Sequence, residues 1–335
     1  MTSGQAGRGE LLIVSGAEVR TALPMKDCIE VVDKAMRAYS RGAAEVPLRT
    51  IMGLADGRNF FGVMPGYLGE PSSLGAKVIA VYPDNPGRGL PSHVGMVLLF
   101  DAERGTPLAV MDAAQITAIR TAAASAVATR ALARADAGHL AILGTGEQAV
   151  THLEAIAAVR ELRSVRIWGR SSDKARDFAR TQGDTLSIGI ELCKSVDEAV
   201  EGADIVCTVT AAREPVLFGA RLKAGAHVNL VGASRANARE ADDDVVTRSR
   251  YFVDSRVSAR AEAGELRHAM DAGLVTESHI RGEIGEVLAG KVPGRLGEQD
   301  ITVYKSHGIA VQDLAAAHAI HARALRDGLG TRAPF

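Results

Sequence analysis

The pattern of apolar and polar positions changes once along the chain. Up to about residue 112, short apolar runs such as NFFGVMPGYL, LGAKVIAVYP and HVGMVLLFD alternate with turn residues. Runs of this length predict strands, and the DAERGTP turn predicts that neighbouring strands form hairpins. This part is therefore predicted to be a mostly antiparallel sheet, preceded by a segment with helical spacing over residues 18–41.

From His139 the apolar runs alternate with helix-like stretches. The predicted strands are HLAILG, SVRIWG, ADIVCTV, HVNLVGA and YFVD, and Ala-rich helices are predicted over residues 114–133 and 311–326. Buried strands that alternate with helices are typical of a parallel sheet covered on both faces. The predicted fold class is α/β: a Rossmann-type doubly wound sheet over residues 129–304, plus an α+β domain formed by residues 1–128 and 305–335.

Composition narrows the class of protein. The 335 residues include 39 Lys plus Arg against 40 Asp plus Glu, and aromatic residues make up 4%. This balance argues against nucleic-acid binding and against attraction to an anionic membrane. No apolar run is long enough to span a membrane, and the polar first ten residues are unlike a signal peptide. The three cysteines are far apart and form no metal-binding motif, so we expect no metal site and a cytoplasmic location.

A glycine loop follows the strand HLAIL and opens a helix. Gly144, Gly146 and Ala149 form the pattern G-x-G-x-x-A, in which the glycines allow a tight turn and close approach of the backbone to a pyrophosphate. The helix N-terminus offers unpaired N–H groups to the phosphates. The strand–turn–helix context predicts a dinucleotide site.

The residues at the end of SVRIWG, the second predicted strand of the parallel sheet, predict the type of dinucleotide. Sites for NAD usually carry an acidic residue there, which accepts hydrogen bonds from the ribose. This sequence has Arg170, Ser171 and Ser172 instead, which suit a 2′-phosphate. We therefore expect NADP(H) to be preferred, with NAD(H) as the alternative.

Three cations stand at apolar positions of the first domain. Lys77 lies inside LGAKVIAVYP, Arg49 inside VPLRTIM, and Arg120 in the Ala-rich helix. Each alone is explained by a solvated face, but buried cations need partners, and together they predict a site for a small carboxylate. His93, at the start of a strand, and His307, in KSHGIAVQD, are weaker candidates that a structural role also explains.

The sequence resembles the ornithine cyclodeaminase/μ-crystallin family from about Leu11 to Ala324. The segments that carry the resemblance include GAKVIAVYP, DAAQITAIRTAAASAVA, LGTGEQA, VNLVGASRANARE and ITVYKSHGIAVQD. The resemblance implies a dinucleotide-binding domain and a substrate domain whose sheet forms a homodimer interface.

The resemblance also implies roles for single residues. Arg49 and Arg120 correspond to the arginines that hold the substrate carboxylate, and Lys77 to the lysine near the reacting carbon. His93 and Ser234 are further candidates for this substrate site. The cofactor-binding residues implied, together with the turn at Arg170, Ser171 and Ser172, are Gly144, Thr145, Gly146, Glu147, Gln148, Ala149, Thr208, Thr210 and Ser306.

One position departs from the cyclodeaminase pattern. Ornithine cyclodeaminases carry an aspartate after the fifth strand, where this sequence has Ser234 in VGASR. Loss of that carboxylate removes the base expected for deamination. The resemblance is therefore to the ketimine reductase branch, which prefers NADPH.

The sequence thus predicts NADPH-dependent reduction of a small α-imino acid to the L-amino acid. The expected substrates are cyclic ketimines such as Δ1-pyrroline-2-carboxylate or Δ1-piperideine-2-carboxylate, with Lys77 as the catalytic residue that assists protonation. Three alternatives stay open: an ornithine cyclodeaminase that forms proline and ammonia, an alanine-type amino-acid dehydrogenase, and a non-enzymatic protein that binds NADPH and a small ligand, as in the μ-crystallin branch. Linear imino acids also stay open as substrates.

Overall fold

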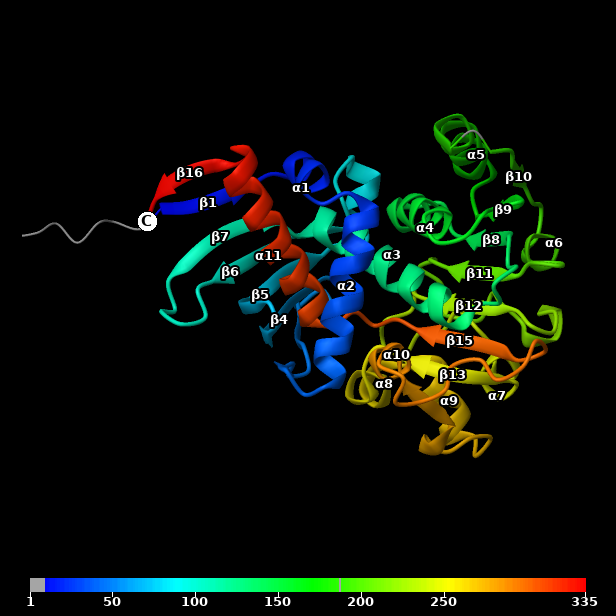
Figure 1. Ribbon diagram of the computed structural model, residues 1–335. Helices are drawn as coiled ribbons and strands as arrows, with labels where there is room; N and C mark the ends of the chain where they lie inside the picture. Colours follow the sequence, from blue (N-terminus) through cyan, green and yellow to red (C-terminus); the bar gives the residue numbers. More distant parts are fainter. Residues whose placement is uncertain (1–9, 187) are drawn as a thin grey trace, which may run out of the picture. The chain divides into compact units, whose positions relative to one another are not determined.

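The structure is a computed structural model that describes residues 10–186 and 188–335 (Figure 1). The chain forms two compact units: the described residues up to Arg120 together with Ile309–Phe335, and Thr121–Gly308. The unit boundaries therefore lie at 120 and 308, whereas the sequence predicted 128 and 304. No break in pattern marks the first boundary, because it falls inside the continuous helix α3 (Ala113–Leu132).

The first unit is built on an eight-stranded sheet with the order β16-β1-β7-β6-β5-β4-β2, to which β3 adds by pairing with β4. All its pairs are antiparallel except β1 with β7, so the prediction from the hairpin pattern is confirmed. The strands are β1 (Glu10–Val14), β2 (Ala44–Glu45), β3 (Thr50–Gly53), β4 (Phe60–Gly69), β5 (Ser72–Val81), β6 (His93–Phe100), β7 (Pro107–Asp112) and β16 (Thr331–Pro334), with a 3-10 turn η1 (Asn85–Arg88) between β5 and β6.

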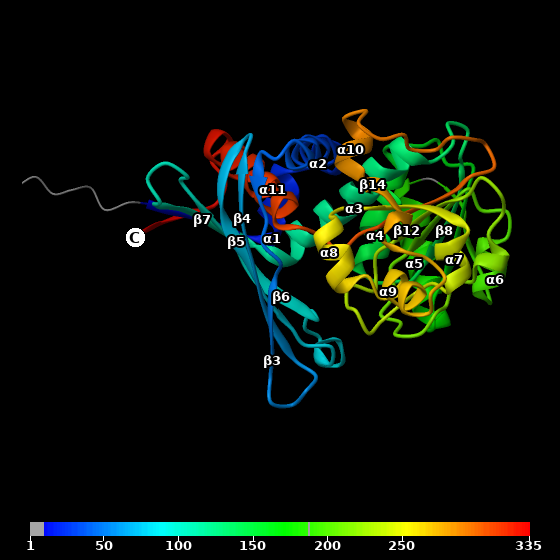
Figure 2. The ribbon, with the colours of Figure 1, turned by 90° about the horizontal axis from the view of Figure 1, so that it is seen from below.

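Helices cover one face of this sheet. The helices α1 (Gly16–Ala22), α2 (Met25–Ser40) and α11 (Ala310–Asp327) lie on the same side, and α11 packs against β4, β5 and β6 (Figure 2). The single helix predicted over residues 18–41 is wrong: the segment is two helices, which are separated at Leu23 and Pro24. Proline disfavours helical geometry at the residue before it, which explains the break. The apolar residues keep a helical spacing across the break, so the spacing alone predicted one helix.

The other face of the sheet is apolar and half-exposed. Alternation along β4 and β6 sends Met64 and Val97 toward the helices, and Phe61 and Met96 to the opposite side. Ile51, Phe61, Val94 and Met96 are 38–51% exposed. Within the described residues of this unit, no helix covers that face (Figure 2).

The second unit holds an eight-stranded sheet with the order β10-β9-β8-β11-β12-β15-β13-β14, and every neighbouring pair is parallel. The strands are β8 (His139–Leu143), β9 (Ser164–Trp168), β10 (Ile190–Leu192), β11 (Ile205–Thr208), β12 (His227–Leu230), β13 (Ser249–Val253), β14 (Ile280–Glu283) and β15 (Ile301–Lys305). The helices are α4 (Glu147–Ala157), α5 (Ser172–Leu186), α6 (Val196–Val200), α7 (Asp243–Thr247), α8 (Arg256–Glu262), α9 (Gly264–Asp271) and α10 (Ile284–Leu288), with the 3-10 turns η2 (Gly219–Arg221) and η3 (Glu277–His279).

Two separate apolar cores show that both faces of this sheet are buried. In β8, Leu140 and Ile142 join a core with the helices α4 and α5, whereas Ala141 and Leu143 join the core that contains α6, α7 and α9. The predicted doubly wound parallel sheet is confirmed. Chain order reverses between β8 and β11, and ligands of such sheets bind at the carboxyl ends of the strands beside that point.

The structure tests only part of the predictions on the N-terminal tail and on the location of the protein. Of the predicted N-terminal polar tail, Glu10 begins β1 and residues 1–9 lie outside the described residues. In the described ranges no helix combines the length and apolar character needed to cross a membrane. The cytoplasmic location stays a prediction.

Candidate active site

The glycine loop in the second unit has the geometry that a dinucleotide requires. Gly144 directly follows β8 with φ +121°, and a Cβ there would lie 2.7 Å from the Val209 carbonyl oxygen. Gly146 precedes the first turn of α4, and a Cβ on it would meet nothing within 4 Å, so the backbone is open to a ligand. Ala149 is fully buried against the sheet. The helix N-terminus therefore points unpaired N–H groups at an accessible loop.

The side chains around the loop leave room for phosphates and ribose. The Gln148 side-chain oxygen is buried with no hydrogen-bond partner among the described residues, and Glu147 is exposed in the first turn of α4. Thr145 lies against Gly169 at the end of β9, where a Cβ would come within 2.5 Å of its methyl group. These contacts fit a dinucleotide held between the ends of β8 and β9.

Arg170, Ser171 and Ser172 form the turn between β9 and α5. All three are exposed, and the Lys174 backbone N–H donates to the Ser171 hydroxyl at 3.4 Å. α5 begins at Ser172, so its first N–H groups lie in the same turn. A guanidinium and a helix N-terminus are thus placed together where the ribose of a dinucleotide would end.

Glu240 joins the loops at the carboxyl ends of β11 and β12, a role the sequence analysis missed. Its carboxylate accepts hydrogen bonds from both hydroxyls predicted to bind cofactor, Thr208 at 2.7 Å and Thr210 at 2.7 Å. It also accepts the backbone N–H groups of Thr210, Gly232 and Ala233 at 2.6–3.1 Å. Thr208 is fully buried, so its hydroxyl is engaged within the protein, and its contact with a cofactor stays a prediction.

A buried ion pair between Lys305 and Glu265 lies next to Glu240. Lys305 in β15 donates to the Ala233 carbonyl at 2.5 Å and lies 3.0 Å from a carboxylate oxygen of Glu265. Glu265 in turn accepts the backbone N–H of Glu240 at 3.0 Å. Burial raises the pKa of Glu240, and the nearby Lys305 opposes that shift. The group fixes the loop that carries Ser234, which is half-buried in the same unit.

Asp254, at the end of β13, holds the segment after β15. Its carboxylate accepts the backbone N–H groups of His307 at 2.7 Å and Gly308 at 2.6 Å, and it lies 3.5 Å from the His307 ring. Although burial raises the pKa of Asp254, these hydrogen bonds bring it below its ordinary value. The neighbouring Ser306 is buried, and its hydroxyl has no partner among the described residues. That hydroxyl is free to meet a ligand.

The first unit brings the predicted cations together around a carboxylate. Lys77 lies on the helix-covered face of β5, and its ammonium nitrogen is 3.1 Å from either oxygen of Asp313 in α11. Arg120, in the middle of α3, donates from Nε to a carboxylate oxygen of Asp313 at 2.9 Å. All three side chains are at most 5% exposed. The carboxylate of Asp313 therefore counters two buried cations at once.

Polar neighbours complete this cluster. Arg120 also donates to the Gln312 side-chain oxygen at 2.9 Å, and Lys77 donates to the Thr117 hydroxyl at 3.4 Å. Arg49 is half-buried just before β3, outside the strand in which the sequence analysis placed it, and its charge acts on Lys77. Lys77 and Arg120 share the one carboxylate of Asp313, which leaves an excess of positive charge in the cluster. Such an excess suits a substrate that brings a carboxylate of its own.

Burial lowers the pKa of Lys77 to about 8, assisted by the charges of Arg120 and Arg49 and opposed by Asp313. The ordinary value is 10.5. A lysine in this range holds and releases a proton near neutral pH, which is what acid–base catalysis requires. The cluster therefore combines an excess of positive charge with a group that can donate a proton.

His93 is not part of this cluster. It is exposed at the start of β6 and contacts the Ser92 hydroxyl at 2.9 Å. In β6, Val97 pairs with Lys77 and His93 pairs with Val81, so His93 lies about 13 Å farther along the strand. Its predicted contact with substrate has no support from this placement.

Comparison with known proteins identifies the family. The model of the ornithine cyclodeaminase/mu-crystallin family matches residues 10–328. The chain is 41% identical to ketimine reductase mu-crystallin of Mus musculus over 297 residues, which cover 88% of this chain and 90% of that protein. The protein belongs to the ornithine cyclodeaminase/mu-crystallin family, as the sequence motifs predicted.

Two solved structures share the whole fold. One is Δ1-pyrroline-2-carboxylate reductase of Thermococcus litoralis in complex with NADH and L-proline: TM-score 0.94, 38% identity, 96% of this chain and 99% of that chain covered. The other is an archaeal alanine dehydrogenase dimer with bound NAD: TM-score 0.92, 30% identity, 98% of this chain and all of that chain covered. Together with the dinucleotide loop, these relatives make the chain an oxidoreductase of this family.

Proposed function

We propose that the protein uses NADPH to reduce the C=N bond of a small cyclic α-imino acid to the L-amino acid. The observation that carries this proposal is the cluster of Lys77, Arg120 and Asp313, in which buried cations outnumber their carboxylate. Relatives named as ketimine reductase and pyrroline-2-carboxylate reductase support the same chemistry. Δ1-Pyrroline-2-carboxylate and Δ1-piperideine-2-carboxylate are the substrates we propose.

The residues of the first unit have distinct roles in this proposal, which makes that unit the substrate domain. Arg120 and Arg49 bind the substrate carboxylate, because a planar guanidinium pairs with it through two hydrogen bonds. Lys77 donates a proton to the imine nitrogen, directly or through water. Asp313 is a positioning residue that holds the Lys77 ammonium in place. Protonation makes the imine carbon a better hydride acceptor.

The second unit binds the cofactor, which supplies the hydride when bound. Gly144 and Gly146 bring the backbone to the pyrophosphate, and the N-terminus of α4 supports its charge. Arg170, Ser171 and Ser172 bind the 2′-phosphate of NADPH, whereas a dinucleotide without it loses these interactions. Thr210 and Ser306 are the proposed contacts toward the nicotinamide end.

We further propose that the protein is a homodimer. The sheet face that carries Phe61, Val78, Val94 and Met96 is apolar and lacks a covering helix among the described residues. A second copy of the same face would cover it, and one relative of this fold is a dimer. Mass measurement in solution at two protein concentrations tests this proposal.

A substrate panel tests the proposed reaction. We expect NADPH oxidation with Δ1-pyrroline-2-carboxylate or Δ1-piperideine-2-carboxylate to be faster than with pyruvate plus ammonia, which is the alanine dehydrogenase reaction. Ornithine should give no ammonia, because Ser234 provides no carboxylate at the position where cyclodeaminases carry one. Formation of proline and ammonia without net cofactor change would favour the cyclodeaminase. Binding of NADPH with no turnover of any substrate would favour a binding protein.

A further inference from the structure

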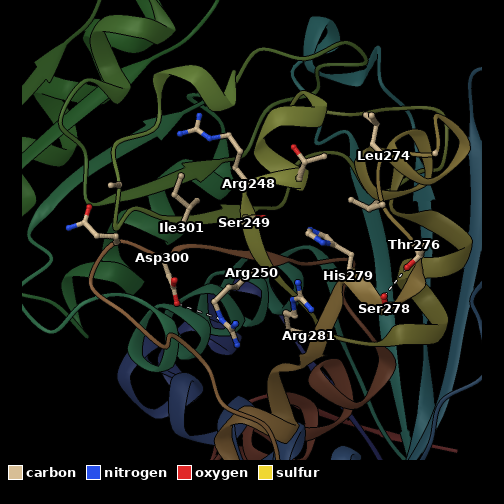
Figure 3. Close-up of a pocket in the computed structure, with 15 residues that line it drawn as sticks. Arg248, Ser249, Arg250, Leu274, Thr276, Ser278, His279, Arg281, Asp300 and Ile301 are labelled. Atoms are coloured by element: carbon tan, nitrogen blue, oxygen red, sulfur yellow. Dashed lines mark hydrogen bonds and ion pairs between the residues drawn. The ribbon is translucent and has the colours of Figure 1, made fainter.

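The sheet of the second unit has a cavity of about 740 Å³ at the edge opposite the glycine loop (Figure 3). Ser249 begins β13, Ile301 begins β15, and His279 ends η3 directly before β14. The lining thus belongs to the amino ends of three parallel strands, whereas dinucleotides bind at the carboxyl ends. The volume lies in the range of small-molecule sites. This cavity is separate from the cofactor site.

Positive charge dominates the lining. Arg248, Arg250 and Arg281 line the cavity together with His279, and Asp300 is the one acidic lining residue. Partial burial raises the pKa of Asp300, but the N–H groups of Leu296 and Gly297 hold it below its ordinary value, so it is ionised. Its oxygen lies 3.8 Å from Arg250, too far for a direct hydrogen bond. Asp300 and Arg250 therefore form a loose ion pair, and the lining as a whole keeps more arginines than carboxylates.

Two of the arginines are fixed by main-chain oxygens. Arg250 donates from Nε to the Gly294 carbonyl at 2.9 Å, and Arg248 donates to the Gly219 carbonyl. A carbonyl orients a guanidinium but does not neutralise its charge. Both side chains keep further N–H groups, because a guanidinium has five donors.

Like Arg248, Arg281 is exposed. It is the extra residue of a bulge in β14, since Tyr251 pairs with Ile280 and Phe252 pairs with Gly282. Its side chain makes no hydrogen bond or ion pair in the described ranges, and its charge acts on His279, whose pKa is lowered mainly by burial. In Figure 3 a dashed line joins Asp300 to Arg250, and none reaches Arg281. An anion in the cavity would supply the missing partner.

We propose that this cavity binds a small polyanion, a molecule with at least two phosphate or carboxylate groups. Hydroxyl groups of Thr276 and Ser278, which contact each other at 2.8 Å, lie in the same lining and add neutral donors. Three arginines against one carboxylate in the lining suit a ligand with several negative charges better than a single monovalent ion. The site lies away from the proposed hydride transfer and is independent of the substrate assigned above.

The test uses the full-length protein saturated with NADPH, so that the glycine loop is occupied. Inorganic pyrophosphate and citrate are titrated separately at constant ionic strength, by calorimetry and by thermal unfolding. We expect saturable binding of at least one probe at one site per chain. Pyrophosphate binding alone identifies a phosphate ligand, and citrate binding alone identifies a carboxylate ligand.

Variants locate the binding. Arg281→Gln should weaken binding about tenfold, and the fold should be retained because this side chain has no partner to lose. The matched control is Arg180→Gln, which removes the same charge from an exposed position on α5 and should leave binding unchanged. The proposal is overturned by the absence of saturable binding of both probes to the NADPH-saturated protein, even where a probe binds once NADPH is omitted, or by equal weakening in both variants.

Discussion

The ammonium of Lys77 and the carboxylate of Asp313 lie 3.1 Å apart in the core of the first unit, although 236 residues separate them in sequence. β5 supplies the lysine and α11 the aspartate, and neither side chain is more than 3% exposed. Arg120 binds the same carboxylate, so one aspartate holds two of the three cations proposed to meet the substrate.

Replacement of Lys77 by methionine tests its role as proton donor. We expect Lys77→Met to lower kcat by about 100-fold or more, because general acid catalysis contributes factors of that size. Methionine keeps much of the length of the side chain, and removal of a buried cation limits the loss of stability. Steady-state kinetics together with a thermal melt measure both effects. Near-normal turnover with unchanged substrate affinity would show that the assignment is wrong.

The pH dependence of the reaction tests the ion pair. The pKa of Lys77 is lowered by burial to about 8, so the ammonium is lost as pH rises through that value. We expect kcat/KM to fall above about pH 8, and to fall at lower pH in Asp313→Asn, which lacks the charge that favours the ammonium. Use of the same substrate for both proteins cancels substrate ionisation. An identical profile for the two proteins would contradict the assigned role of Asp313.

The same lysine affects stability in a defined direction. Between about pH 8 and its ordinary pKa of 10.5, the unfolded chain binds more protons at Lys77 than the folded chain does. This group therefore makes folding more favourable as pH rises through that window. Comparison of the free energy of unfolding of the wild type and Lys77→Met across this range measures the effect. The free energy of unfolding of the wild type should increase relative to that of Lys77→Met as pH rises.

Substitution of Arg49 tests carboxylate binding and leaves the hydrogen bond from Arg120 to Asp313 in place. We expect Arg49→Gln to raise KM about tenfold with a smaller change in kcat, because one charge-assisted contact is lost. Arg41→Gln is the matched control: this arginine is exposed and pairs with Glu70. An equal effect of both substitutions would point to a general effect of charge.

Arg170 should determine the preference between the two dinucleotides. We expect the wild type to have a lower KM for NADPH than for NADH, and Arg170→Gln to raise the KM for NADPH about tenfold while that for NADH hardly changes. Arg176→Gln removes the same charge from an exposed position of α5 and serves as the control. A wild type that prefers NADH would overturn the proposed cofactor.

Glu240 offers a test of how the cofactor site is held in shape. Glutamine in its place cannot accept all the N–H and hydroxyl donors that now meet at the carboxylate. We expect Glu240→Gln to weaken NADPH binding about tenfold and to leave binding of 2′,5′-ADP unchanged, because this fragment reaches only the loop and the Arg170 turn. Equal loss for both ligands would indicate a general structural defect.

The sequence predicts those parts of the fold and site whose signal is local. The loop at Gly144 stands directly after an apolar strand, and Lys77 is conspicuous within one. By contrast, Asp313 looks like a polar position of an ordinary amphipathic helix, and the chain gives no sign that α11 lies against β5. Glu240 is missed for the same reason, since its donors come from segments up to 32 residues away. Pro24 is a local signal for the break between α1 and α2, but the helical spacing of the apolar residues favoured a single helix.

The most direct test of the central claim is the stoichiometry of one reaction. The purified protein is mixed with NADPH and Δ1-pyrroline-2-carboxylate, or the six-membered ring analogue, and both the NADPH consumed and the amino acid formed are measured. The proposed reaction yields one L-amino acid for each NADPH oxidised, and both NADPH oxidation and amino-acid formation should be lost in Lys77→Met. Absence of NADPH oxidation with every cyclic imino acid, by a protein that binds NADPH, would contradict it.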